Sequence, residues 1–511
     1  MENLSRRTFL RKAVLYTAGV AFPRVFSTSW ATPRLRIPYG VQSGEVTPGG
    51  AVVWAASDRP ARMVVEWSTT DRFRDVQRIV GPWATPDSGF TAKVWIPDLP
   101  PGSDIFYRVF FEDPSDPAAR SEPMMGHLRT PPQDTRTVRF LWSGDTAGQG
   151  WGVNPEWGGM RIYETMRRLQ PDFFVHCGDM IYADNPLLPA VALPDGSVWR
   201  NVVTPEKAKV AETLEEFRGN YRYNLLDANV RRFHAEVPVY VLWDDHEVTN
   251  NWYWERVLHE DARYTVKDVR TLAVRAKRAM WEFTPLRGPR VYRKISYGPH
   301  LDLFLLDMRT YRGPNGENRQ LVLEPGARIL GSEQVRWLKR ELLRSRATWK
   351  VIAADMPLGL IVYHDAGRRW GSEAVAQGSG PPMGRELEIA EVLAFLKQHG
   401  IQNTVWITAD VHYCATHHYH PDRAQFRDFL PFYEFVSGPL HAGGFGPNAL
   451  DDTFGPAVVF QKHPPTPNTP PTAGYLFFGE AVIDGRSGVL TVRHRDVSGA
   501  VLHELMLEPR R

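Results

Sequence analysis

The chain has 511 residues, enough for more than one domain with a sizeable apolar core. Its formal net charge of +3 at pH 7 is close to zero, so the sequence lacks the basic footprint of a nucleic-acid-binding protein. Only two cysteines, Cys177 and Cys414, are present, which excludes a disulfide scaffold. We expect them to be buried free thiols, with a disulfide or a metal-ligand role as the alternatives.

The N-terminus carries the pattern of an export signal. Arg6 and Arg7 precede Phe9-Leu10 and the apolar stretch 13–22. Twin arginines before a modest apolar stretch are typical of a Tat signal peptide, here residues 1–31, whereas the start of a basic amphipathic helix is the alternative. No apolar run reaches the length of about 20 residues that spans a bilayer, so no transmembrane anchor is expected. The sequence therefore predicts export by the Tat machinery to the periplasm or the extracellular space.

Residues 35–130 predict an all-β domain. Apolar strand-like runs at 51–55, 63–67 and 105–111 are separated by turns rich in proline and glycine. Short strands with such turns are typical of a β-sandwich of the fibronectin or immunoglobulin type. The segment 131–134 is the expected linker to the next domain.

Residues 136–511 predict an α/β domain with a C-terminal β extension. Helical patterns occur at 160–169, 205–220, 332–343 and 385–399, and β-type runs return at 476–482, 489–493 and 501–505. Four further strand-like runs, 138–142, 172–176, 237–243 and 404–408, each lead directly into acidic or histidine residues. Because open α/β sheets place ligands at the carboxyl ends of their strands, this order predicts one metal site at a sheet edge.

The residues that follow these four runs have the chemistry of metal ligands. The predicted ligands are Asp145, Asp179, Tyr182, Asp244, Asp245, Asp410 and His412. Any one aspartate alone would be a turn residue or a helix N-cap, but four such clusters in order favour a site. A mixed oxygen and nitrogen set favours iron, zinc or manganese, whereas an all-oxygen set favours calcium or magnesium. We expect Asp179 to bridge two ions. The phenol of Tyr182 favours Fe³⁺, and Asp145 and His412 are expected to complete the ligand set of that ion. The second ion is expected to be held by Asp245, Asp410 and Asp244.

Two ions about 3.5–4 Å apart form a clamp for a phosphoryl group. We therefore expect hydrolysis of a phosphate ester by in-line attack of a metal-bound hydroxide. His246 is the expected donor to the leaving oxygen, with a buried structural histidine as the alternative. Arg309 and Arg312 follow another apolar strand and are expected to bind phosphate oxygens, with structural ion pairs as the alternative.

Three further features are left open by the pattern. The tract 417–420, with three histidines, is expected to be strand and loop rather than a metal site. Asp355 follows the strand-like run 349–354 and is a further candidate for the same sheet edge. The segment 371–384, rich in glycine and proline, is expected to be a long loop over the site.

These motifs resemble those of the PhoD-type alkaline phosphatases, calcineurin-like metallophosphoesterases that include enzymes described as phosphodiesterases or phospholipases D. The resemblance covers nearly the whole chain after the signal. It is carried by 39–47, Gly178-Asp179 with Tyr182, 243–247 with Asn250 and Asn251, Leu306-Asp307 with Arg309, 331–334 with Trp337-Leu338, Asp410 with His412, and 434–439.

The resemblance implies an α/β four-layer αββα sandwich after the β-sandwich domain, and a site with Fe³⁺ and Ca²⁺. It implies Asp179, Tyr182 and His412 on iron and Asp179, Asp244, Asp245 and Asp410 towards calcium, with a Zn²⁺ or Mn²⁺ pair as the alternative. Two residues depart from the family. Asp145 stands where many members have cysteine, and this aspartate makes the site more similar to that of the purple acid phosphatases. Gly313 stands where some members have an aspartate.

The expected activity is that of a secreted alkaline phosphomonoesterase. Phosphodiesterase or phospholipase D-like activity is the alternative, because the metal ligands are the same and only the width of the pocket separates the substrates. A non-catalytic protein that binds metal or phosphate is a third possibility, which the intact ligand set opposes.

Overall fold

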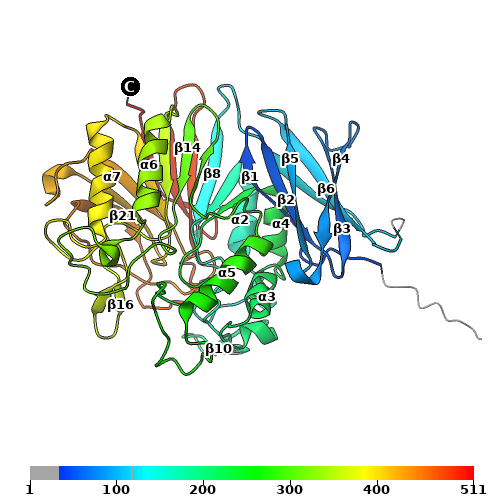
Figure 1. Cartoon of the computed structure of the whole chain (residues 1–511), viewed down its shortest axis with the longest axis horizontal. Helices are drawn as coiled ribbons and strands as arrows, with labels where there is room; N and C mark the ends of the chain where they lie inside the picture. Colours follow the sequence, from blue (N-terminus) through cyan, green and yellow to red (C-terminus); the bar gives the residue numbers. More distant parts are fainter. Residues whose placement is uncertain (1–33, 117–118, 511) are drawn as a thin grey trace, which may run out of the picture. The chain divides into compact units, whose positions relative to one another are not determined.

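The computed structural model describes residues 34–116 and 119–510. The predicted Tat signal, residues 1–31, lies outside these ranges. Within them, the strands form sheets of nine, seven and four strands and two small hairpins (Figure 1).

The nine-stranded sheet combines strands from both ends and the middle of the chain. It contains β1 (Val41–Thr47), β2 (Gly50–Ala56), β5 (Thr91–Pro97), β8 (Val138–Ser143), β9 (Phe173–His176), β12 (Val239–Val241), β22 (Phe477–Ile483), β23 (Leu490–Asp496) and β24 (Val501–Leu507). Their order is β24-β23-β22-β8-β9-β12-β1-β2-β5. The strands from β8 to β1 are parallel, and the pairs on both flanks are antiparallel.

The N-terminal strands are divided between two sheets. β3 (Ala61–Ser68), β4 (Gln77–Ala84), β6 (Asp104–Glu112) and β7 (Met124–Arg129) form the antiparallel sheet β4-β3-β6-β7. β1 pairs instead with β12, where Gly44 lies opposite Val239. A Cβ on Gly44 would lie 2.3 Å from the carbonyl oxygen of Val239, so this close approach of the two strands requires glycine.

The seven-stranded sheet carries the rest of the α/β part. It contains β13 (Arg293–Ser296), β14 (Leu301–Leu305), β15 (Trp349–Ala353), β18 (Thr404–Thr408), β19 (Cys414–Tyr419), β20 (Phe432–Val436) and β21 (Pro456–Lys462). Their order is β13-β14-β15-β18-β20-β19-β21, parallel from β14 to β20. The small hairpins are β10 (Ala190–Ala192) with β11 (Val198–Arg200), and β16 (Tyr363–Asp365) with β17 (Trp370–Ser372).

Three of the predicted helices are confirmed and one has wrong bounds. The helices are α2 (Arg161–Arg168), α3 (Leu214–Asn224), α4 (Ala228–Glu236), α5 (Val269–Phe283), α6 (Ser332–Arg344) and α7 (Glu386–Gln398). The predicted helix at 205–220 starts too early, because Pro205–Lys207 form only a 3-10 turn. Helix α3 begins after Thr213, whose hydroxyl accepts from Glu216 N while the Glu216 carboxylate accepts from Thr213 N.

Alternate residues of the parallel strands point into two different cores, as the twofold period of a strand requires. Leu303, Val351 and Val405 share one buried cluster with Phe140 and Trp142 of β8. Their neighbours Phe304, Ile352 and Trp406 lie in a second cluster with residues of α6 and α7 (Figure 1). The seven-stranded sheet is therefore covered by the strand β8 region on one face and by these helices on the other.

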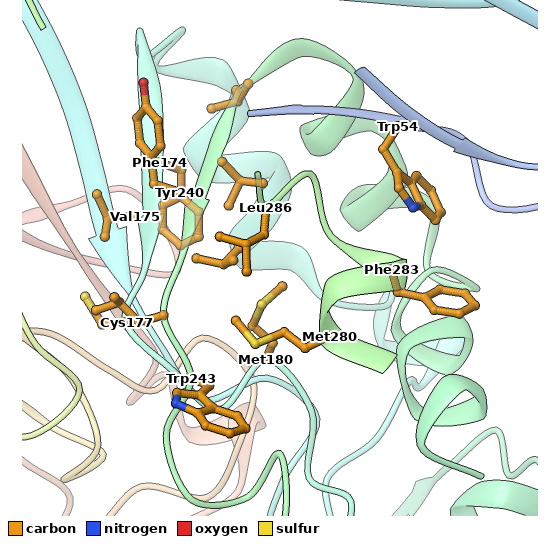
Figure 2. Close-up of a cluster of buried hydrophobic side chains, with 14 of the residues drawn as sticks. Trp54, Phe174, Val175, Cys177, Met180, Tyr240, Trp243, Met280, Phe283 and Leu286 are labelled. Carbon is orange, nitrogen blue, oxygen red and sulfur yellow. The ribbon is translucent and has the colours of Figure 1, made fainter. Parts of the chain in front are cut away.

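The strand ends that lead into the predicted ligands are anchored in the first core. Figure 2 shows Cys177, Met180 and Trp243 with Phe174 and Tyr240 in this apolar cluster. Cys177 and Met180 bracket the Gly178-Asp179 pair, and Trp243 directly precedes Asp244. The polar residues at this edge are thus held by buried neighbours in the chain.

Candidate metal centre

Backbone hydrogen bonds join the loop after β8 to the loops after β9 and β20, and the loop after β18 to the loop after β15. Asp145 N donates to Gly178 O (3.2 Å), and Thr146 N donates to Asp179 O (2.8 Å). In the other large sheet, Ala409 N donates to Asp355 O (2.9 Å), and Leu440 N donates across to Gly144 O (2.8 Å). The predicted ligands of both sheets are thereby brought to the same place.

One group of possible metal ligands consists of Asp145, Asp179 and His412. All three are buried, and their ligand atoms lie within 4.8 Å of one another. The Tyr182 hydroxyl lies 2.9 Å from His412 Nε2, and an Asp145 carboxylate oxygen lies 3.5 Å from the same nitrogen. His412 Nδ1 lies 2.5 Å from Gly443 O, so a hydrogen donated there leaves the Nε2 lone pair facing the group.

The second group consists of Asp179, Asp245 and His246, again with ligand atoms within 4.8 Å of one another. Asp179 is therefore shared between the two groups, as expected for a bridging carboxylate. His246 N donates to an Asp179 oxygen (3.1 Å), and Asn251 N donates to Asp245. The rings of His246 and Tyr182 stack with centroids 4.3 Å apart, which links the two groups.

Asp244 and Asp410 lie outside both groups and face Arg309. The fully buried Arg309 guanidinium pairs with Asp244 (Nε to Oδ1, 2.7 Å), Asp355 (3.1 Å) and Glu373, and lies 3.9 Å from Asp410. These contacts correspond to the ion-pair alternative for Arg309 and give Asp355 a place at the sheet edge.

Arg312 is also buried and pairs with Glu373 (2.9 Å). Both arginine side chains thus form ion pairs with carboxylates of the protein itself. Binding of substrate phosphate by Arg309 and Arg312 stays a prediction.

The charge of the buried carboxylates fits a bound cation. Both oxygens of Asp145 and one oxygen of Asp244 are buried without a hydrogen-bond partner. Burial, followed by repulsion from neighbouring carboxylates, raises the pKa of Asp145 and Asp179 well above the ordinary value. Burial lowers the pKa of His412 to about 4, which keeps the imidazole neutral and able to ligate. Unpartnered carboxylates beside a neutral imidazole and a phenol are suited to a metal ion.

The backbone is also held in an unusual conformation at this edge. Asp145, Asp179, Asp410 and His412 have φ angles of 68°, 54°, 68° and 60°. Non-glycine residues rarely occupy this left-handed region, and such outliers gather at functional sites. A Cβ on Gly178 (φ 110°) would lie 2.5 Å from that of Asp244, so glycine is required between the two ligand loops.

Three polar residues of the site had no predicted role. Asp184 accepts from His246 Nδ1 (2.7 Å) and from Asn250 N (2.8 Å), and Glu247 accepts from Met180 N and Asp244 N. The buried Lys207 Nζ donates to the carbonyl oxygen of Tyr182 (2.7 Å). Asp184 stands in the same short motif as Asp179, but nothing in the spacing identifies His246 as its partner.

The pKa values of the Asp184–His246 pair are shifted in opposite directions. Burial alone would lower the pKa of His246, but the carboxylates of Asp184, Asp245 and Asp179 outweigh it and raise the pKa well above the ordinary value. Burial alone would raise the pKa of Asp184, yet His246 and the backbone N–H of Asn250 bring it to about 2. The pair therefore favours an imidazolium held by a carboxylate, which cannot ligate a metal and leaves Asp179 and Asp245 as the ligands of the second group.

The other open features have structural explanations. Cys177 and Cys414 are both buried and free, as expected. His417 lies on β19 and pairs with Glu434 (3.1 Å), so it belongs to neither ligand group. The segment 371–384 contains part of β17, and its Glu373 reaches Arg309 and Arg312. Among the described residues, no helix has both the length and the apolar character to cross a membrane.

Two large mixed sheets, with a carboxylate shared between two groups of possible metal ligands, fit a phosphatase of the metallophosphoesterase type. The chain belongs to the PhoD-like phosphatase family, whose sequence model matches residues 140–494, and the model of the family's N-terminal domain matches residues 24–132. It is accordingly a phosphoric ester hydrolase. The resemblance inferred from the motifs is thereby confirmed.

Individual relatives agree with this family. Alkaline phosphatase D of Bacillus subtilis (strain 168) is 27% identical over 448 residues, which cover 81% of this chain and 71% of that protein. A solved structure of PhoD is similar in fold, with a TM-score of 0.69 at 20% identity, covering 93% of this chain and 90% of that one. A purple acid phosphatase from yellow lupin (Lupinus luteus) seeds matches 93% of this chain and 74% of its own, with a TM-score of 0.60 at 14% identity.

Proposed function

We propose that this phosphatase is an exported alkaline phosphomonoesterase with two metal ions at the Asp179 edge. The observation that carries the proposal is the position of Asp179 in both ligand groups, because one carboxylate can then hold two ions side by side. The Tat-type N-terminus supports a periplasmic or extracellular location, although those residues lie outside the described ranges. The two core clusters support a four-layer αββα arrangement, and the N-terminal strands support an immunoglobulin- or fibronectin-like origin.

We assign Fe³⁺ to the group that contains Tyr182 and Ca²⁺ to the more acidic side. A phenol, an imidazole and two carboxylates suit a hard trivalent ion, whereas Asp245 and Asp410, which repel each other, offer only oxygen. Asp145 supplies a carboxylate where many family members have a thiolate. When bound, the ions supply Lewis acidity to phosphate oxygens and lower the pKa of a water.

The chain's own residues account for orientation and proton transfer. Asp184 holds Nδ1 of His246, which fixes the ring and leaves Nε2 to donate to the leaving oxygen of the ester. Arg309 pairs with Asp244, Asp355 and Glu373 and so offsets part of the negative charge on this side of the acidic edge. Lys207 holds the backbone of Tyr182 in place.

The proposed substrate class is tested by comparing rates on a chromogenic phosphomonoester and the matching diester, with calcium supplied. We expect the monoester to be hydrolysed at least about tenfold faster, a difference of about 1.4 kcal/mol in activation free energy. A faster diester would reassign the enzyme to phosphodiesterase or phospholipase D-like work. No hydrolysis of either ester would favour a non-catalytic metal- or phosphate-binding protein.

The iron assignment is tested by Tyr182→Phe. Phenylalanine fills the same buried space but removes the hydroxyl, so we expect iron content and any visible phenolate charge-transfer band to be lost while the fold is retained. Elemental analysis and absorption spectroscopy measure both effects. Tyr240→Phe is the matched control, because Tyr240 is also buried and donates to Val46 O. An unchanged band and iron content in Tyr182→Phe would remove Tyr182 from the site.

A further inference from the structure

We infer that Trp370 and His364 of the β16–β17 hairpin, together with Tyr253, bind the organic group of the substrate and favour esters that carry a planar ring. This inference rests on the proposed function, since it extends the same site. It assigns a specificity-determining role to residues that ligate no metal and carry no part of the reaction itself.

The hairpin is attached to the metal centre through Asn251. The backbone N–H of Asn251 donates to Asp245, a member of the second ligand group, and its side-chain amide donates to His364 O (2.9 Å). His364 is therefore two hydrogen bonds away from Asp245. Tyr253 follows Asn251 by two residues, so its place is set by the same loop.

A second attachment fixes the His364 ring. Asn315 Oδ1 accepts from Arg385 (2.6 Å), and Asn315 Nδ2 donates to Glu373 (2.7 Å) and to Asn251 O (2.9 Å), with His364 Nδ1 3.1 Å away. Burial and the nearby Arg256 lower the pKa of His364, which supports the neutral form. The hairpin is thus held at both its backbone and a side chain.

Three aromatic rings lie together where the hairpin is linked to the centre through Asn251. The ring centroids of Tyr253 and His364 are 6.4 Å apart, and those of His364 and Trp370 are 6.0 Å apart. Tyr253 and His364 are half-buried, whereas Trp370 is 53% exposed. An exposed tryptophan next to fixed rings offers a face on which a planar group can stack, which contributes more than apolar burial alone.

Charge near these rings suits a phosphate ester. Arg256 lies close enough to lower the pKa of His364, and Arg369 stacks over Tyr363 of the same hairpin, 5.4 Å from the ring centroid. Glu373 and Asp365 also act on His364 and offset part of this positive charge, so the selection among esters depends on the rings. The ligand class that fits is a phosphate monoester of an aromatic or heteroaromatic alcohol.

The test compares steady-state constants for an aryl phosphate and glycerol phosphate, with released phosphate measured for both. In Trp370→Ala we expect KM for the aryl ester to rise about five- to tenfold, the size of one aromatic contact, with kcat and the constants for glycerol phosphate unchanged. Trp370→Phe should restore most of the difference, because a ring is retained. Trp83→Ala, which removes a similarly exposed tryptophan from β4 of the four-stranded sheet, should change nothing.

The outcomes distinguish a failure of the specificity role from a failure of the proposed function. Equal changes for both esters, or no change in Trp370→Ala, would overturn the specificity role while hydrolysis persists. Failure of the unaltered enzyme to hydrolyse either ester would overturn the proposed function, and this inference with it.

Discussion

Replacing Asp179 with asparagine should reduce hydrolysis of a phosphomonoester by at least about 10³-fold, which corresponds to about 4 kcal/mol of transition-state stabilisation. Asp179 is the single residue shared by both ligand groups, and asparagine removes its charge without changing its size. The loss should appear in kcat, because both ions would be weakened at once. Circular dichroism should report an unchanged fold, since removing one of several repelling buried carboxylates relieves charge.

The control for Asp179→Asn is the same substitution at Asp428. Asp428 is largely exposed and pairs with Lys397 on the surface, so asparagine there should leave rate and metal content unchanged. Retention of full activity by Asp179→Asn would mean that the catalytic centre lies elsewhere.

Replacing Asp184 with asparagine should reduce kcat about a hundredfold while metal content is retained. Asp184 belongs to neither ligand group, but it accepts from His246 Nδ1 and raises the pKa of that ring. Without the carboxylate, the His246 pKa falls. If the imidazolium is the proton donor, activity is lost as pH rises through this pKa, so the alkaline limb of the rate profile should move to lower pH in the variant.

A double-mutant cycle distinguishes this positioning role from a general loss of structure. In a His246→Gln background, Asp184→Asn should add little further loss, because its effect passes through His246. The assigned role would be contradicted if the losses in rate multiplied in the double variant, or if Asp184→Asn lost its metal.

The location of the site could be predicted because its signal is local. Asp145, Asp179, Asp245 and His412 each follow a short apolar run, and strands of that kind bring their carboxyl ends to one edge. The start of α3 was also readable, since Thr213 and Glu216 have the spacing of a capping box that the prediction overlooked.

The partners of the charged residues could not be predicted, because they are set by tertiary packing. Arg309 has the sequence context of a phosphate-binding residue, but its guanidinium pairs with Glu373, which lies 64 residues further along the chain. Asp184 and His246 are 62 residues apart in the chain. In the same way, the pairing of β1 with β12 depends on contacts far apart in sequence, so the N-terminal strands were expected to be separate from the α/β sheet.

The most direct test of the account is the amount of metal bound per chain, measured side by side in the unaltered enzyme and in Asp179→Asn. We expect two ions per chain, one of them iron, in the unaltered protein and a loss of bound metal in the variant, in parallel with the loss of rate. Equal metal content in the two proteins, or a fully active unaltered enzyme without metal, would contradict it.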